Sequence, residues 1–128
     1  MSNTMEAGLA RTQLDKLRGR LTADRASVTD LIVMLKSMLE SFNASQRGVI
    51  ADDEHDPEGP SIAVQRSEST AMLAQARRHL DEINTAVARF EDGSYGVCEG
   101  CGRDIPFARL NARPHATHCI NCAEQLTR

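Results

Sequence analysis

The four cysteines of this chain stand in two Cys-x-x-Cys pairs near the C-terminus, in the pattern Cys98-x2-Cys101-x17-Cys119-x2-Cys122. Each Cys-x-x-Cys turn supplies two adjacent thiolates, and a linker of roughly 15 to 20 residues brings the second pair back to the first. Zinc prefers four such sulfurs in a tetrahedron, at a Zn–S distance of about 2.3 Å. The spacing therefore predicts one structural Zn²⁺ held by all four cysteines. Zinc catalysis is not expected, because no coordination position stays open.

Other uses of paired cysteines fit this chain less well. A disulfide framework belongs to oxidising compartments, and a thioredoxin-type redox couple sits in a βαβ pattern that the sequence lacks. A zinc-linked thiol sensor is compatible with the structural site. His115 and His118 lie close to Cys119, but four cysteines already saturate the metal, so we expect surface or turn residues rather than ligands. Gly102, next to Cys101, is expected to let backbone N–H groups approach the sulfurs.

The composition favours long helices over a large aromatic core. Aromatic residues make up 3% of the 128 residues and there is no Trp, whereas Ala, Leu, Arg and Glu are abundant. The first residues lack the apolar segment of a secretory signal. The longest apolar run, residues 31–35, is far shorter than the roughly eighteen residues of a membrane span. We expect a soluble, cytoplasmic protein without membrane contact, whose thiols stay reduced.

Apolar residues recur three and four positions apart in two segments, with the period of helices that pack against each other. The first series is Leu14, Leu17, Leu21, Val28, Leu31, Leu35, Met38 and Phe42, and the second is Leu73, Ala76, Leu80, Ile83, Val87 and Phe90. The segment "RGVIADDEHDPEGP" between them contains Pro and Gly, which do not continue a helix interior. The pattern predicts helices near residues 8–46 and 60–92, with Gly93 as the stop of the second. Gly19 inside the first helix should cost about 1 kcal/mol relative to Ala.

The predicted fold class is mostly α. An antiparallel two-helix coiled-coil hairpin occupies residues 1–92, and a four-cysteine zinc-finger module with a short C-terminal helix occupies residues 93–128. The turn of the hairpin is acidic: residues 51–60 contain five Asp or Glu and no Lys or Arg, in a chain whose net charge is −3. In an arbitrary hairpin such a turn is simply solvated. We call residues 51–60 the acidic tip.

The cysteine module resembles the zinc-finger signature of the DksA/TraR family of RNA-polymerase-binding regulators. The matching residues are Gly96, Cys98, Cys101, Gly102, Ile105, Arg109, Leu110, Ala112, Pro114, Cys119 and Cys122. The resemblance implies a bacterial transcription regulator that docks on RNA polymerase and inserts the hairpin into the secondary channel to modulate initiation. It makes the acids of the tip the candidate partner-binding residues: Asp52, Asp53, Glu54, Asp56 and Glu58. It implies no chemistry by the chain itself, so an enzyme is not expected.

The sequence departs from the family at two places. The family's tip motif is Asp-x-x-Asp-x-Ala, whereas this chain has Asp53-x-x-Asp56-x-Glu58. Members that respond to the alarmone guanosine tetraphosphate carry basic residues on the second helix and just after the last cysteine. Gln75, Glu82 and Ala123 occupy those positions here. We therefore expect weak or no alarmone binding through that site.

Three other functions compete with the regulator. A nucleic-acid-binding zinc ribbon needs a basic patch and stacking aromatics, but residues 98–128 contain four Arg against three acids, with Phe107 as their aromatic residue. A hydrolase or nuclease with Mg²⁺ on the acidic tip lacks a rigid frame for catalysis. A structural coiled-coil adaptor needs a free apolar seam, which two stripes that close on each other do not leave. We expect a monomer whose partner is RNA polymerase, with no direct sequence-specific binding of nucleic acid.

Overall fold

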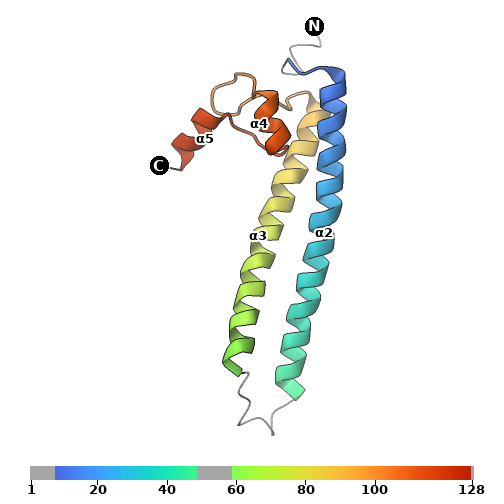
Figure 1. Ribbon diagram of the computed structural model, residues 1–128, viewed down its shortest axis with the longest axis vertical. Coiled ribbons are helices and arrows are strands. Elements are labelled where there is room, and N and C mark those ends of the chain that lie inside the picture. The colour runs from blue at the N-terminus through green and yellow to red at the C-terminus, as the bar shows by residue number, and fades with distance from the viewer. Residues whose placement is uncertain (1–7, 49–58, 128) are drawn as a thin grey trace. The chain divides into compact units, whose positions relative to one another are not determined.

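The computed structural model describes residues 8–48 and 59–127. Four helices occur in this part of the chain (Figure 1): α2 (Arg11–Gly48), α3 (Gly59–Asp92), α4 (Phe107–Ala112) and α5 (Ile120–Leu126). Its β-structure is a single isolated antiparallel bridge between Val97 and Asp104. The predicted mostly α fold class, with a helical hairpin and a four-cysteine module, is confirmed. No described helix combines the length and the apolar character that a membrane crossing requires.

The chain divides into two compact units, and each long helix contributes to both. One unit combines the residues up to Ala26 with those from Leu80 onward, and the other is Ser27–His79. The first unit thus holds the cysteine module, whereas the second holds the parts of α2 and α3 that are nearer to residues 49–58. The predicted domain limits, residues 1–92 and 93–128, stay a prediction.

In the first unit, α2 and α3 pack through the predicted apolar stripe. Leu17, Leu21 and Ile83 have no exposed surface, and fully burying such a side chain contributes about 1.5–3 kcal/mol. The guanidinium of Arg18 lies over the ring of Phe90 at 4.9 Å from the ring centroid. This cation–π contact closes the stripe at the C-terminal end of α3.

In the second unit, the buried stripe contains a polar residue as well as apolar ones. Val28 and Leu35 of α2 and Leu73 and Ala76 of α3 are buried. On α3 the line continues toward the N-terminus through Ser69, which is 5% exposed. Hydrophobic periodicity did not reveal this part, because a small hydroxyl residue fits between close-packed helices without being apolar.

One position of the predicted stripes is wrong, and one buried residue of α3 lies outside them. Met38 is exposed, and Leu39 is the half-buried residue instead. Seven residues fall short of two full turns, so a contact line along a straight helix drifts by about 20° per heptad and passes to the next residue. On α3, Ala86 is more deeply buried than Val87. The cysteine module covers this second face of α3, as the ion pair of Glu82 with His115 shows.

The helix ends are set by local hydrogen bonds. Gly8 adopts a φ of 75°, a left-handed conformation that turns the chain, and the side chain of Gln13 accepts a hydrogen bond from the N–H of Ala10. Helix α2 therefore begins at Arg11 rather than near residue 8. Gly93, with a φ of 82°, follows the last residue of α3 and confirms the predicted stop.

We predict that Gly19→Ala stabilises the protein by about 0.5–1 kcal/mol, because Gly in a helix interior costs conformational entropy. A Cβ atom at this position would meet no atom within 4 Å. Gly8→Ala is the matched control with the opposite sign: its φ is left-handed and the new Cβ would lie 3.1 Å from Oδ2 of Asp104. Urea unfolding followed by circular dichroism measures both changes. A loss of stability in Gly19→Ala would contradict the prediction.

Candidate metal centre

The structure brings the four predicted cysteines together. Their sulfur atoms all lie within 4.8 Å of one another. A zinc tetrahedron with Zn–S bonds of about 2.3 Å has S···S edges of about 3.8 Å, so a slight contraction of this cluster yields that geometry. Cys98 is buried and Cys101 is exposed, whereas Cys119 and Cys122 are partly exposed. The donor set, four thiols and no other group, fits zinc.

The first pair stands on a tight hairpin. The N–H of Cys98 donates to the carbonyl of Arg103 at 2.8 Å, and the N–H of Gly102 donates to the carbonyl of Cys98 at 2.9 Å. Gly102 has a φ of 77°, and a Cβ at this position would have no atom within 4 Å. Glycine is favoured at this position because the turn requires a left-handed backbone conformation. The expected role of Gly102, close approach of the backbone to the sulfurs, is wrong.

The second pair begins helix α5 and is joined to the first by the backbone. Cys119 is the N-cap residue of α5, and Cys122 lies in its first turn. The N–H of Glu99 donates to the carbonyl of Thr117 at 2.8 Å, and Nε of Arg109 donates to the carbonyl of His118 at 2.7 Å. The bond of Glu99 holds the segment before Cys119 against the hairpin of the first pair, and the bond of Arg109 holds it against α4.

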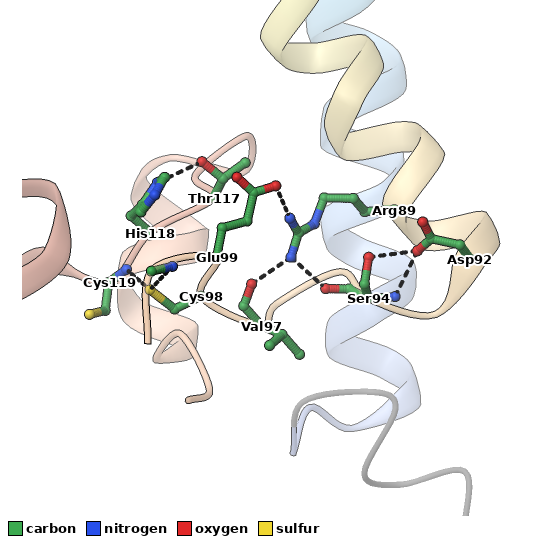
Figure 2. Close-up of polar contacts among 10 residues, drawn as sticks. Arg89, Asp92, Ser94, Val97, Cys98, Glu99, Thr117, His118 and Cys119 are labelled. Atoms are coloured by element: carbon green, nitrogen blue, oxygen red, sulfur yellow. Dashed lines mark hydrogen bonds and ion pairs between the residues drawn. The ribbon is translucent and has the colours of Figure 1, made fainter. Parts of the chain in front are cut away.

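The backbone stabilises a thiolate at Cys98. Its Sγ accepts hydrogen bonds from the N–H groups of Gly100 and Cys119, each at 3.3 Å (Figure 2). Burial raises the pKa of the Cys98 thiol, but the N–H groups of Cys119, Cys101 and Gly100 outweigh it and lower the pKa to about 6. Such donors are the outer-shell groups that orient metal ligands and compensate their charge.

Cys122 shows the opposite behaviour. Hydrogen bonds to the thiols of Cys119 and Cys98, followed by desolvation, raise its pKa to about 12. Several thiolates cannot gather in this space without a cation, because each disfavours the ionisation of the next. The cluster is therefore ready for a divalent ion that neutralises it and is consistent with one structural zinc.

The two histidines lie outside the cysteine cluster, as expected. Nδ1 of His118 is 2.9 Å from Oγ1 of Thr117. Nε2 of His115 is 3.5 Å from a carboxylate oxygen of Glu82, and the His115 side chain is only 15% exposed. His115 is thus a turn residue but not a surface residue. Its ring and Glu82 help to line a cavity of about 350 Å³, together with Arg109 and Arg113.

Sequence reasoning missed an aromatic contact beside the metal centre. The rings of Phe90 and Tyr95 stack with centroids 3.9 Å apart and an interplanar angle of 15°. The hydroxyl of Tyr95 donates to the carbonyl of Pro114 at 2.8 Å, and Tyr95 is 3% exposed. The contact joins the end of α3 to the loop before the second cysteine pair. The sequence feature that could have pointed to this contact is that Tyr95 is the single tyrosine of the chain.

The candidate partner-binding acids, Asp52, Asp53, Glu54, Asp56 and Glu58, lie outside the described residues, so their role stays a prediction. The alarmone prediction also stays one. Gln75 is exposed, Ala123 is half-buried, and Glu82 pairs with His115.

Comparison with known proteins finds relatives of the cysteine module and of the fold. Residues 93–128 match the family model "Prokaryotic dksA/traR C4-type zinc finger". An uncharacterised protein of Aquifex aeolicus is 29% identical over 119 residues, which is 90% of this chain and 77% of that protein. The "RNA polymerase-binding transcription factor DksA" of Caulobacter vibrioides is 47% identical over 49 residues, which is 38% of this chain and 34% of DksA. The matched region thus covers about a third of the length of that DksA.

A solved structure extends the likeness to nearly the whole chain. Transcription factor DksA2 from Pseudomonas aeruginosa has a TM-score of 0.74 and 25% sequence identity, covering 99% of this chain and 89% of DksA2. Fold and site together define a helical-hairpin protein with a four-cysteine zinc finger. The chain is similar to the DksA/TraR family in its four-cysteine module and to DksA2 in its fold.

We predict that removing zinc unfolds residues 93–128. The module has a small core, with Ile105, Leu110 and Ala116 among its buried residues, so metal binding supplies much of its folding energy. Tyr95 is the single tyrosine in a chain without tryptophan, and its fluorescence reports on the module. Chelation under reducing conditions should change this signal, and added zinc should restore it. An apo-protein that keeps the native signal and a cooperative transition there would contradict the prediction.

A second prediction concerns alkaline pH. Burial raises the pKa of Tyr95 far above its usual value near 10, although the charge of Arg20 opposes the shift. A raised folded-state pKa means that the stabilisation from the neutral phenol is complete below about pH 10 and is lost as the pH rises toward the folded-state pKa. Phenolate absorbance should therefore stay absent in the zinc-loaded protein at pH 11 and appear near pH 10 in denaturant. Reversible ionisation near pH 10 with unchanged circular dichroism would contradict this.

Proposed function

We propose that this chain is a transcription regulator that binds RNA polymerase and performs no catalysis itself. The observation that carries the proposal is the structural likeness to the transcription factor DksA2 over 99% of the chain. The family model matches the part of the chain that contains the cysteine cluster, and DksA relatives, whose name states that they bind RNA polymerase, are similar over 49 residues. We further propose a cytoplasmic monomer that does not recognise a DNA sequence directly.

The four cysteines, Cys98, Cys101, Cys119 and Cys122, are proposed as the ligands of one structural Zn²⁺. A closed set of four thiolates holds the metal in a tetrahedron and leaves no position for water or substrate. Bound zinc then acts as a clamp between the hairpin of the first pair and helix α5. In this proposal residues 93–128 are a domain that binds the polymerase and thereby positions the helical hairpin of residues 1–92.

The proposed mechanism delivers carboxylates to the polymerase active centre through its secondary channel. Two helices that bury apolar side chains against each other are stiffer than a single helix. Such residues are Leu17, Leu21 and Ile83 in the first unit and Leu35 and Leu73 in the second. The connection of the two helices carries the five acids of the tip. Acidic oxygens interact with Mg²⁺ and with basic side chains, so the tip would change transcription initiation without a reaction of its own.

We predict that the double variant Asp53→Ala, Asp56→Ala loses the effect on transcription but keeps polymerase binding. Run-off transcription from a ribosomal-RNA-type promoter with the cognate polymerase measures the effect, and fluorescence titration measures binding. The Kd should stay within about threefold, because in this proposal residues 93–128 supply most of the binding to the polymerase. Asp30→Ala, Asp81→Ala is the matched control, since it also removes two exposed acids from the chain.

The outcomes separate the parts of the proposal. If the control and the intact protein alter transcript yield and the tip variant does not, the tip acids carry the regulatory role. If the tip variant acts like the intact protein, the role of the tip is wrong. If the zinc-loaded protein does not bind core polymerase at all, the proposed function fails, and a structural adaptor becomes the better hypothesis.

A further inference from the structure

The side chain of Arg89, in the last turn of α3, is almost enclosed by the segment that leads into the first cysteine pair. It is 12% exposed. One of its terminal nitrogens, NH1, forms an ion pair with the carboxylate of Glu99. The other, NH2, donates to the carbonyl of Ser94 at 2.8 Å and to the carbonyl of Val97. Figure 2 shows the guanidinium among these three acceptors.

Two of these acceptors flank a cysteine of the cluster. Val97 precedes Cys98 and Glu99 follows it, so Arg89 holds the chain on both sides of Cys98. The peptide groups of Cys98 itself are bonded to Arg103 and Gly102 on the other side of the hairpin. Cys98 is 1% exposed. Its sulfur therefore has little freedom to leave the cluster unless the contacts of Arg89 break first.

The main chain of Arg89 adds to this attachment. Its carbonyl accepts hydrogen bonds from the N–H groups of Ser94 at 3.0 Å and Tyr95 at 3.1 Å. Residue 89 thus binds residues 94–99 through both its backbone and its side chain. A planar guanidinium serves a carboxylate and two carbonyls in fixed directions, whereas the ammonium of Lys is a compact charge on a flexible stem.

We propose that Arg89 is a positioning residue of the metal centre, which holds Cys98 in the geometry of a ligand and slows the release of zinc. Release begins when one sulfur moves away from the metal. For Cys98 this movement displaces the flanking peptide groups, and their displacement breaks the hydrogen bonds to Arg89. The inference rests on the proposed zinc ligands but is independent of polymerase binding.

The test is the rate of zinc transfer from the zinc-loaded, full-length protein to a chromogenic chelator in excess. Arg89→Met keeps an unbranched, largely apolar stem and removes the guanidinium with all three contacts. We expect its release rate to rise by about 10- to 100-fold, the effect typical of losing an outer-shell partner. The release rate of Arg89→Lys should lie between those of the unmodified protein and Arg89→Met. The ammonium of Lys can pair with Glu99, but it does not reproduce the planar arrangement of donors in the guanidinium. Arg77→Met, at an exposed position of the same helix, is the matched control and should release zinc like the unmodified protein.

A purely structural role predicts a different pattern. If Arg89→Met lowers the unfolding temperature but releases zinc at the unmodified rate, the proposal is overturned. If this variant fails to fold, Glu99→Gln supplies the test, because it weakens one contact at an exposed side chain. Its release should be faster than that of the unmodified protein, and an unchanged rate overturns the proposal.

Two further variants isolate the assumptions. In the double variant of Arg89→Met with Glu99→Gln, the Glu99 change should add nothing, since the contact is already lost; additive effects overturn the claim that the two residues act as a pair. Cys98→Ser should lower zinc affinity sharply. If Cys98→Ser retains normal zinc content and affinity, the ligand assignment itself is wrong, which is distinguishable from an unchanged rate in Arg89→Met.

Discussion

The gathering of four sulfur atoms within 4.8 Å is the constraint on which the C-terminal part of the structure depends. The segments that supply them are short, and the buried side chains between them, such as Ile105 and Leu110, are few. A core of this size does not hold such segments together, whereas a tetrahedral metal site does. Two backbone N–H groups donate hydrogen bonds to the sulfur of Cys98. Zinc would therefore complete a site whose electrostatics the fold has prepared.

The same unit shows how such a site is attached to a long helix. Arg89 and the stacked pair of Phe90 and Tyr95 connect the last turn of α3 to both sides of the cysteine module. These contacts combine a charge-assisted hydrogen bond, an aromatic stack and a buried hydroxyl, and none of them is a metal ligand. The position of the module on α3 follows from these side chains rather than from zinc.

Within each of the two units, α2 and α3 pack against each other with few large side chains. Leucines, one isoleucine and one alanine are the most deeply buried, and the small side chains of Ala76 and Ser69 are buried as well. The outer faces are mostly polar, but they also expose large apolar side chains: Val33, Met34 and Met38 on α2, and Val64 and Met72 on α3. Five acids stand in the connection, residues 51–60, which contains no Lys or Arg. This local charge supports the proposed role of the tip as the part that meets the partner.

The sequence by itself determined the metal site, the two long helices and the acidic connection, because each depends on local chemistry. Cysteine spacing fixes which sulfurs can meet, the period of apolar residues fixes a helix face, and Gly93 stops a helix through its own φ. The tertiary structure decided which polar side chains matter. Arg89 has the same appearance in the sequence as the exposed Arg77, and Ala86 lies outside the predicted stripe. Both residues become buried when the cysteine module folds against α3. Local sequence patterns do not predict this contact, because it joins segments that are apart in the sequence.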